Sequence, residues 1–228
     1  MKTLFVTVGT TLFNELINVT TNCDALKWMC LNGYTNLIVQ YGNGCRPDMP
    51  EQYILEEASN DRTKKNQLNI SKVLHIESYT FKPSLKIDMI QANTIISHAG
   101  AGTVMEMLRL HKERIIVVIN TILMDNHQVE LATAMSNRQH IHVVSDPKLL
   151  LFANSGSSYN TTTNADENNI SVSKNGSIKT NHTIWDEMES FRSKPYGGGN
   201  EDDFPNILNH FFHLNTGEYE DNDNTKKD

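Results

Sequence analysis

Short β-branched runs alternate with segments of helical periodicity up to about Leu151, and this alternation constrains the fold more than any other feature. It is typical of βαβ units built around a parallel sheet. Several runs are apolar throughout, as expected of strands that are covered on both faces. The sequence therefore predicts an α/β fold with a Rossmann-like parallel sheet flanked by helices. The predicted strands are Leu4–Val8, Leu37–Gln40, Lys72–Ile76, Thr94–Ser97, Ile115–Ile119 and Ile141–Val144.

Apolar residues at helical spacing predict five helices between these strands. Gly33 offers a C-terminal stop for the second helix, and Pro83 is suited to begin the third. The polar segment 56–69 is interpreted as a connecting loop or an exposed helix. The apolar positions are Phe13, Leu16 and Ile17; Ala25, Leu26, Met29 and Cys30; Leu85, Ile87, Met89 and Ile90; Val104, Met107, Leu108 and His111; Val129, Leu131, Ala132 and Met135.

The composition divides the chain into a folded part and a polar part. Only 38% of the 228 residues are hydrophobic, so part of the chain is expected to lack a packed core. We predict a Rossmann-like domain over 1–153 and a disordered, low-complexity insertion over 154–200, rich in Ser, Asn, Thr and Gly. A helical apolar stripe predicts a docking helix over 201–215, and a polar tail follows over 216–228.

The charge and the cysteines exclude several classes of function. A net charge of -7 disfavours sequence-independent nucleic-acid binding, which depends on clustered Lys and Arg. The three cysteines show no C-x-x-C spacing, so neither a disulfide framework nor a zinc site is indicated, and reduced thiols are expected. No apolar stretch reaches the roughly 18 residues needed to cross a bilayer, so we expect no direct membrane insertion.

The run from Ser97 through His98, Ala99, Gly100, Ala101 and Gly102 to Thr103 joins a predicted strand to a predicted helix. Its glycines let a ligand approach the backbone closely. The first amides of a helix have no intrahelical partner and lie at the positive end of the helix dipole. This turn is therefore predicted to bind phosphate through backbone amides.

Two neighbouring features have both a binding and a structural interpretation. Gly9-Thr10-Thr11 follows the first strand, and its hydroxyls either donate to phosphate oxygens or cap the next helix. Glu106 lies three residues after Thr103, so its carboxylate either accepts from the two hydroxyls of a ribose or closes a capping box. The G-x-G-x-x-G fingerprint is absent after the first strand, which disfavours a nicotinamide cofactor.

A third polar turn, Asp125-Asn126-His127-Gln128, follows the fifth strand. Asp125 and Gln128 have capping-box spacing, but the amides of Asn126 and Gln128 also suit recognition of sugar hydroxyls, because each offers donors and an acceptor without charge. His98 and His127 are candidate proton acceptors or hydrogen-bond donors, and no catalytic residue is assigned. The carboxyl edge of an open parallel sheet binds ligands, so all three turns are expected to meet at one crevice.

Four segments together, Phe5–Thr11, Leu37–Gly42, Ile96–Thr103 and Leu123–Gln128, closely resemble one family. It is the cytosolic subunit family of the eukaryotic transferase that adds the second N-acetylglucosamine (GlcNAc) to dolichyl diphosphate. That family is similar to the carboxyl-terminal, donor-binding half of the bacterial MurG transferase, which has the GT-B fold. The resemblance covers most of residues 1–145, whereas Glu113-Arg114 stands where many relatives have Lys-Pro.

The resemblance implies an inverting glycosyltransferase subunit that binds UDP-GlcNAc as donor substrate and needs no cofactor or metal. A membrane-anchored partner subunit would recruit the lipid-linked GlcNAc acceptor at the cytosolic face of the endoplasmic reticulum. The turn 97–103 would hold the diphosphate, and Glu106 the uridine ribose. Asn126, His127 and Gln128 would hold the GlcNAc moiety, and Gly9 and Thr10 would border the cleft on the acceptor side.

Three other interpretations are kept open. A regulatory or scaffold subunit would keep the phosphate-binding turn but transfer nothing. A stand-alone glycosyltransferase would need no partner, and the presence of one predicted Rossmann-like unit argues against it. An NAD-dependent oxidoreductase is disfavoured by the missing dinucleotide fingerprint.

Overall fold

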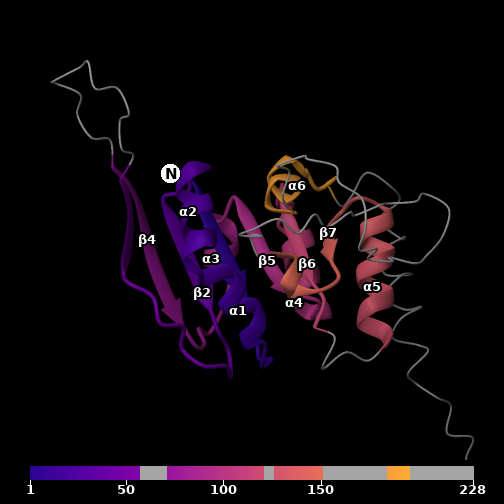
Figure 1. Ribbon diagram of the computed structural model, residues 1–228. Helices are drawn as coiled ribbons and strands as arrows, with labels where there is room; N and C mark the ends of the chain where they lie inside the picture. The colour runs from indigo at the N-terminus through magenta and orange to yellow at the C-terminus, as the bar shows by residue number, and fades with distance from the viewer. Residues whose placement is uncertain (57–70, 121–125, 151–183, 196–228) are drawn as a thin grey trace, which may run out of the picture.

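A seven-stranded sheet forms the centre of the molecule (Figure 1). The computed structural model describes residues 1–56, 71–120, 126–150 and 184–195, and only the backbone of 126–128 and 130. The strand order is β3-β4-β2-β1-β5-β6-β7, and every neighbouring pair is parallel except β3–β4. The strands are β1 (Thr3–Thr7), β2 (Asn36–Gln40), β3 (Gln52–Glu56), β4 (Ser71–Tyr79), β5 (Thr94–His98), β6 (Ile115–Val118) and β7 (His142–Val144). The predicted α/β class is confirmed.

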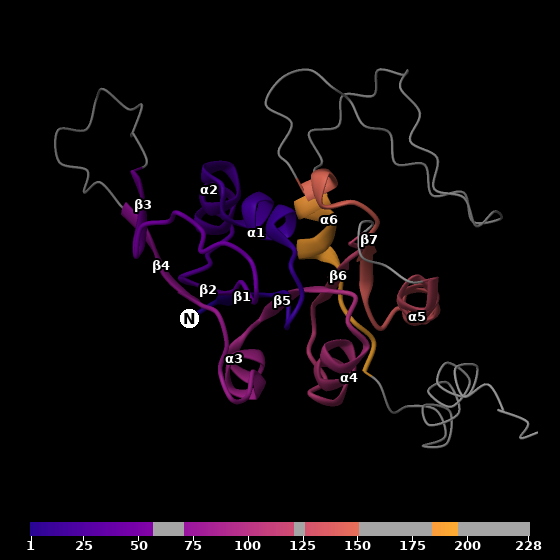
Figure 2. The same cartoon turned by 90° about the horizontal axis from the view of Figure 1, so that it is seen from below.

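Helices cover both faces of this sheet, as Figure 2 shows. One core cluster joins one face to α1 (Asn14–Thr21), α2 (Cys23–Leu31), the 3-10 turn η1 (Pro147–Leu150) and α6 (Ile184–Ser190). The other cluster joins the opposite face to α3 (Lys86–Gln91), α4 (Ala101–Arg109) and α5 (Asn126–Asn137). Strands β1, β5 and β6 are buried along their whole length, which explains the apolar runs that they contain.

All six predicted strands form, and the sequence analysis missed one. Strand β3 pairs antiparallel with β4 at the sheet edge, and its side chains alternate between exposed and half-buried. Ile54 is 55% exposed there, and Gln52 and Glu56 at the two ends of the strand leave an apolar run of three residues, too short to predict a strand. The polar segment after it, 57–70, lies outside the described residues.

The five predicted helices also form, with two shifted boundaries. Helix α4 ends at Arg109, so the predicted His111 lies beyond it with φ 49°. Asn22 caps α2 by accepting from the amide of Ala25, and Gly33 follows the helix at φ +77°, as expected of a C-terminal stop. Pro83 does not begin α3: the helix starts at Lys86, after a turn in which the Ser84 hydroxyl accepts from the Lys86 amide. None of the helices among the described residues is long and apolar enough to cross a bilayer.

The interpretation of 154–200 as one disordered insertion is wrong for its last part, because Ile184–Ser190 forms α6 and joins the core. The Trp185 side chain is fully buried, and its ring centroid lies 4.9 Å from that of Trp28. Its indole N–H donates to the Leu150 carbonyl at 2.6 Å. The domain therefore extends beyond residue 153. The predicted docking helix 201–215 and the tail 216–228 lie outside the described residues.

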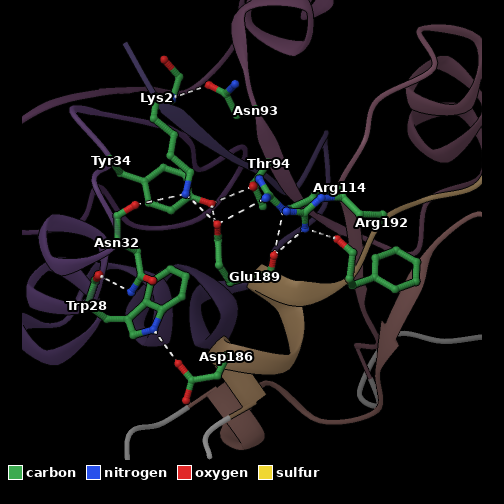
Figure 3. Close-up of polar contacts among 12 residues, drawn as sticks. Lys2, Trp28, Asn32, Tyr34, Asn93, Thr94, Arg114, Asp186, Glu189 and Arg192 are labelled. Atoms are coloured by element: carbon green, nitrogen blue, oxygen red, sulfur yellow. Dashed lines mark hydrogen bonds and ion pairs between the residues drawn. The ribbon is translucent and has the colours of Figure 1, made fainter.

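Glu189 of α6 joins the amino ends of several strands in one polar network (Figure 3). Its carboxylate accepts from the Lys2 ammonium at 2.6 Å and from the Tyr34 hydroxyl at 2.8 Å, and it lies 3.3 Å from the Arg114 guanidinium. The Tyr34 hydroxyl also lies 2.7 Å from the hydroxyl of Thr94. Burial alone would raise the pKa of Glu189, but the hydrogen bonds from Lys2 and Tyr34 and the charges of Lys2 and Arg114 lower it below its ordinary value.

Candidate functional site

The chain reverses its direction of travel across the sheet between β1 and β5. From β1 the chain runs through α1 and α2, on one face of the sheet, to β2, and then through β3 to β4. Helix α3 crosses the opposite face and leads to β5, which lies on the other side of β1. The loops that leave the carboxyl ends of β1 and β5 therefore diverge. In open α/β sheets this switch point is where a ligand-binding crevice forms.

The turn after β5 presents the amino end of α4 to this crevice. Gly100 is the N-cap residue, and no side chain makes a capping hydrogen bond there. The first intrahelical bond runs from the Val104 amide to the Gly100 carbonyl at 3.0 Å. The amides of Ala101, Gly102 and Thr103 thus lie in the first turn, where a helix has no backbone partner for them. This is the geometry of an anion site.

Both capping alternatives are contradicted by the helix boundaries. Thr103 lies inside α4 and not at its N-cap, so Thr103 and Glu106 cannot form the capping box that their spacing suggested. The N-cap of α1 is Phe13, without a side-chain cap, so neither Thr10 nor Thr11 caps that helix. These hydroxyl and carboxylate groups are not used as caps.

His98 packs between the two glycine-bearing loops. A Cβ added to Gly9 would lie 2.8 Å from the His98 ring and 3.7 Å from the Thr103 hydroxyl, and one added to Gly100 would overlap the same ring. Gly9 also has φ +58°, which disfavours any larger residue. Both glycines are therefore required for close packing of the β1 and β5 loops around the imidazole.

A cavity of about 390 Å³ lies between these loops. It is lined by most of the predicted phosphate-binding turn, by the loop after β1, by the end of β2 and by the loop between β4 and α3. The lining residues are Gly9, Thr10, Gln40, Phe81, Lys82, Leu85, His98, Gly100, Ala101, Gly102 and Thr103.

The other predicted site residues do not line this cavity. Ser97 is fully buried, and its hydroxyl donates to the His98 carbonyl at 3.0 Å. Thr11 and the half-buried Glu106 lie outside the lining set. Residues 126–128 form the first turn of α5, but their side chains are outside the described part of the chain.

Sequence analysis missed four lining residues: Gln40, Phe81, Lys82 and Leu85. Lys82 carries the one charged side chain among the lining residues of this cavity. Its ammonium lies 3.1 Å from both carboxylate oxygens of Asp88 and 3.1 Å from Glu77, and 4.0 Å from the centre of the Tyr79 ring. Phe81 and Lys82 follow the carboxyl end of β4, where ligands bind, but the predicted strand ended at Ile76, so this signal was not visible in the sequence.

Two histidines, the buried His98 and the half-buried His142, make stability dependent on pH. Burial lowers the pKa of His98, while an interaction with the Thr7 backbone raises it by a smaller amount. Burial also lowers the pKa of His142, against a smaller raising effect of Glu187. His98 Nδ1 and His142 Nε2 are buried, and neither has a hydrogen-bond partner among the described residues. Both imidazoles are therefore neutral at pH 7.

We expect the free energy of unfolding to fall between pH 7.5 and pH 5.5, by up to about 1 kcal/mol for each of the two histidines. The unfolded chain binds a proton at each ring as the pH falls through the ordinary histidine pKa of about 6.5, whereas the folded chain stays neutral until a lower pH. Urea unfolding at both pH values measures the difference. His142→Phe should remove about half of it, and replacement of the exposed His75 by Gln should leave it unchanged. A pH-independent unfolding curve for the wild type would contradict this.

Comparison with known proteins shows that the part of the chain that contains this cavity matches a protein family. Residues 3–151 match the model of the glycosyltransferase family 28 C-terminal domain. Human UDP-N-acetylglucosamine transferase subunit ALG13 is 38% identical over 62% of this chain and 11% of its own length. The subunit of the same name from Yarrowia lipolytica is 32% identical over 64% of this chain and 66% of its own length. The chain thus spans about a tenth of the human and mouse relatives.

Solved structures give more distant similarities. A solution structure of ALG13 has 23% identity and a TM-score of 0.43, covering 64% of this chain and 79% of that one. MurG from Acinetobacter baumannii has 16% identity and a TM-score of 0.42, covering 65% of this chain and 38% of that one. The family model covers more than half of the chain and includes every residue that lines the cavity. The chain belongs to the glycosyltransferase family 28 C-terminal domain family.

Proposed function

We propose that this chain is the donor-binding subunit of a UDP-GlcNAc-dependent inverting transferase, which adds the second GlcNAc to GlcNAc-diphosphodolichol. A membrane-anchored partner subunit supplies the acceptor side and holds the pair at the cytosolic face of the endoplasmic reticulum. The observation that carries the proposal is the amino end of α4, uncapped by any side chain and open to a cavity at the switch point of the sheet.

The electrostatics of the cavity favour a diphosphate. The amino end of α4 has a partial positive charge, and the amides of its first turn point toward the loop that precedes it. Lys82 also lines the cavity, but its ammonium is paired with Asp88 and Glu77, and His98 is neutral. A nucleoside diphosphate is therefore bound mainly by the backbone amides.

The same groups support departure of UDP. In the proposed reaction the acceptor 4-hydroxyl attacks the anomeric carbon, and a new C–O bond forms on the face opposite the departing group. The bond from the anomeric carbon to the β-phosphate oxygen breaks, and its electron pair stays on the phosphate. The proton of the attacking hydroxyl passes to a general base, which is not assigned to a residue of this chain. Amides fixed at the amino end of α4 stabilise this growing charge without reorganisation.

The assignments of the sugar, the lipid acceptor and the partner subunit are based on similarity to other proteins. The human and Yarrowia proteins are named as subunits of a UDP-N-acetylglucosamine transferase. We extend the sugar nucleotide and the subunit role from those names to this chain. The dolichol acceptor rests on the family resemblance of the motifs 5–11, 37–42, 96–103 and 123–128.

A calorimetric titration of the full chain tests the proposal. UDP-GlcNAc and UDP are expected to bind to the chain alone, and UDP-GlcNAc to bind more tightly than UDP-glucose once the membrane subunit is present. Transfer of GlcNAc to a lipid-linked acceptor is expected only from the pair. A chain that binds no uridine nucleotide, or that transfers GlcNAc alone, would overturn the proposal.

Glu106→Gln is expected to weaken UDP binding about tenfold, because a carboxylate that accepts from both ribose hydroxyls contributes roughly 1.5–3 kcal/mol, more than a neutral amide. The comparison of UDP with 2′-deoxy-UDP makes the test specific. The wild type should prefer UDP, and the preference should shrink in the variant. Glu113→Gln, on an exposed residue outside the cavity, is the matched control. An undiminished preference in Glu106→Gln would remove Glu106 from the site.

A further inference from the structure

Gln40, the last residue of β2, is buried at the carboxyl edge of the sheet and uses every hydrogen-bonding position of its side-chain amide. Its oxygen accepts from the Thr7 hydroxyl at 2.6 Å and from the Val8 amide at 3.2 Å. Its nitrogen donates to the carbonyls of Gly9 and Thr80, each at 2.7 Å. One side chain thus joins the ends of three adjacent strands, β1, β2 and β4.

These contacts fix the loop that carries Thr10. Gly9 has a positive φ, and its carbonyl is oriented by the Gln40 amide, while its own amide donates to the Thr7 hydroxyl at 3.2 Å. The position of Gly9 in turn sets its close approach to His98 and Thr103. Gln40 itself lines the cavity beside Gly9 and Thr10. The amide therefore determines where the β1 loop stands relative to the amino end of α4.

We infer that Gln40 is a positioning residue for the proposed transferase: it holds the Gly9–Thr10 loop, on the acceptor side of the cleft, in register with the phosphate-binding end of α4. This inference rests on the proposed function. Gln40 acts through the loop and does not touch the reacting atoms. Its loss should therefore reduce turnover more than donor affinity, because the amides of α4 belong to a separate segment of chain.

The chemistry of the amide makes a near-isosteric test available. Gln40→Glu keeps the oxygen that accepts from Thr7 and Val8 but replaces the amino group by a second oxygen, so the carbonyls of Gly9 and Thr80 lose their N–H donors. Thr7→Val keeps the shape of the strand and removes the hydroxyl that donates to Gln40 and accepts from Gly9. The second variant is the milder one and tests the same loop if Gln40→Glu does not fold.

Asn36→Ala is the matched control, because Asn36 is the amide-bearing residue at the other end of the same strand. Its side chain donates to the hydroxyls of Thr3 and Thr35 and does not line the cavity beside α4. All variants are studied as the full chain, alone for UDP calorimetry and with the membrane subunit for transfer. Turnover is expressed per UDP-binding site, so that a smaller folded fraction does not lower it.

We expect kcat per binding site to fall at least tenfold in Gln40→Glu and at least threefold in Thr7→Val, with the Kd for UDP within threefold of the wild type. Asn36→Ala should keep wild-type turnover per site. Wild-type turnover in both loop variants, or a loss of UDP affinity equal to the loss of turnover, would overturn the positioning role. A wild-type pair that binds no UDP or transfers no sugar would instead overturn the proposed function.

Discussion

Replacement of Glu189 by Ala is expected to lower the free energy of unfolding by about 3 kcal/mol. The change leaves the Arg114 guanidinium, whose side chain is 9% exposed, without its carboxylate, and it removes the acceptor of the Tyr34 hydroxyl. Truncation of one partner of a buried ion pair costs roughly 3–5 kcal/mol, and the partial exposure of Glu189 places the expected loss at the lower end.

Urea unfolding followed by tryptophan fluorescence measures this loss directly. The chain has two tryptophans, and Trp28 and Trp185 are in contact across the interface between α2 and α6, so the signal reports docking of α6. Glu187→Ala, two residues earlier on the same helix, is expected to change stability by less than about 0.5 kcal/mol. Equal effects of the two substitutions would show that the Glu189 network does not hold α6 in place.

Gly102→Ala is expected to weaken UDP binding about a hundredfold, or roughly 2.7 kcal/mol, while making the fold slightly more stable. Gly102 is the second residue of α4, and a Cβ built there meets no protein atom within 4 Å. Because Gly102 lines the cavity, the added methyl group is expected to hinder the approach of the phosphate to the first-turn amides. Ala is the better helix former, so about 0.5 kcal/mol of stability should be gained.

Opposite effects on folding and binding distinguish this prediction from general damage. Calorimetry with UDP measures the affinity, and thermal unfolding without ligand measures the stability. Gly33→Ala is the control, because Gly33 has φ +77° and free space around it. Gly33 precedes the amino end of β2, whereas the cavity lies at the carboxyl ends of the strands. That change should reduce stability and leave the Kd for UDP unaltered. Wild-type affinity in Gly102→Ala would show that phosphate does not contact the backbone at this turn.

Local sequence was sufficient to predict most of the fold. Strands β1, β5 and β6 have apolar runs because both of their faces are covered, and this pattern is visible without any knowledge of the neighbours. The glycine-bearing turn after β5 was identified for a similar reason, since small residues between a strand and a helix are a local requirement for close backbone approach. The edge strand β3 was missed because one of its faces is open and its pattern is weak.

The sequence by itself determined most of the strands and helices and the turn that carries uncapped amides, because hydrophobic periodicity and glycine conformation act over a few residues. Only the tertiary structure decided that Gln40 would join the ends of three strands and that Lys82 would face the same cavity. It also decided that α6 would pack on the core, where Glu189 accepts a hydrogen bond from Tyr34, 155 residues earlier in the chain. Such contacts depend on strand order and chain crossover, which bring together side chains whose separation along the chain contains no periodic signal.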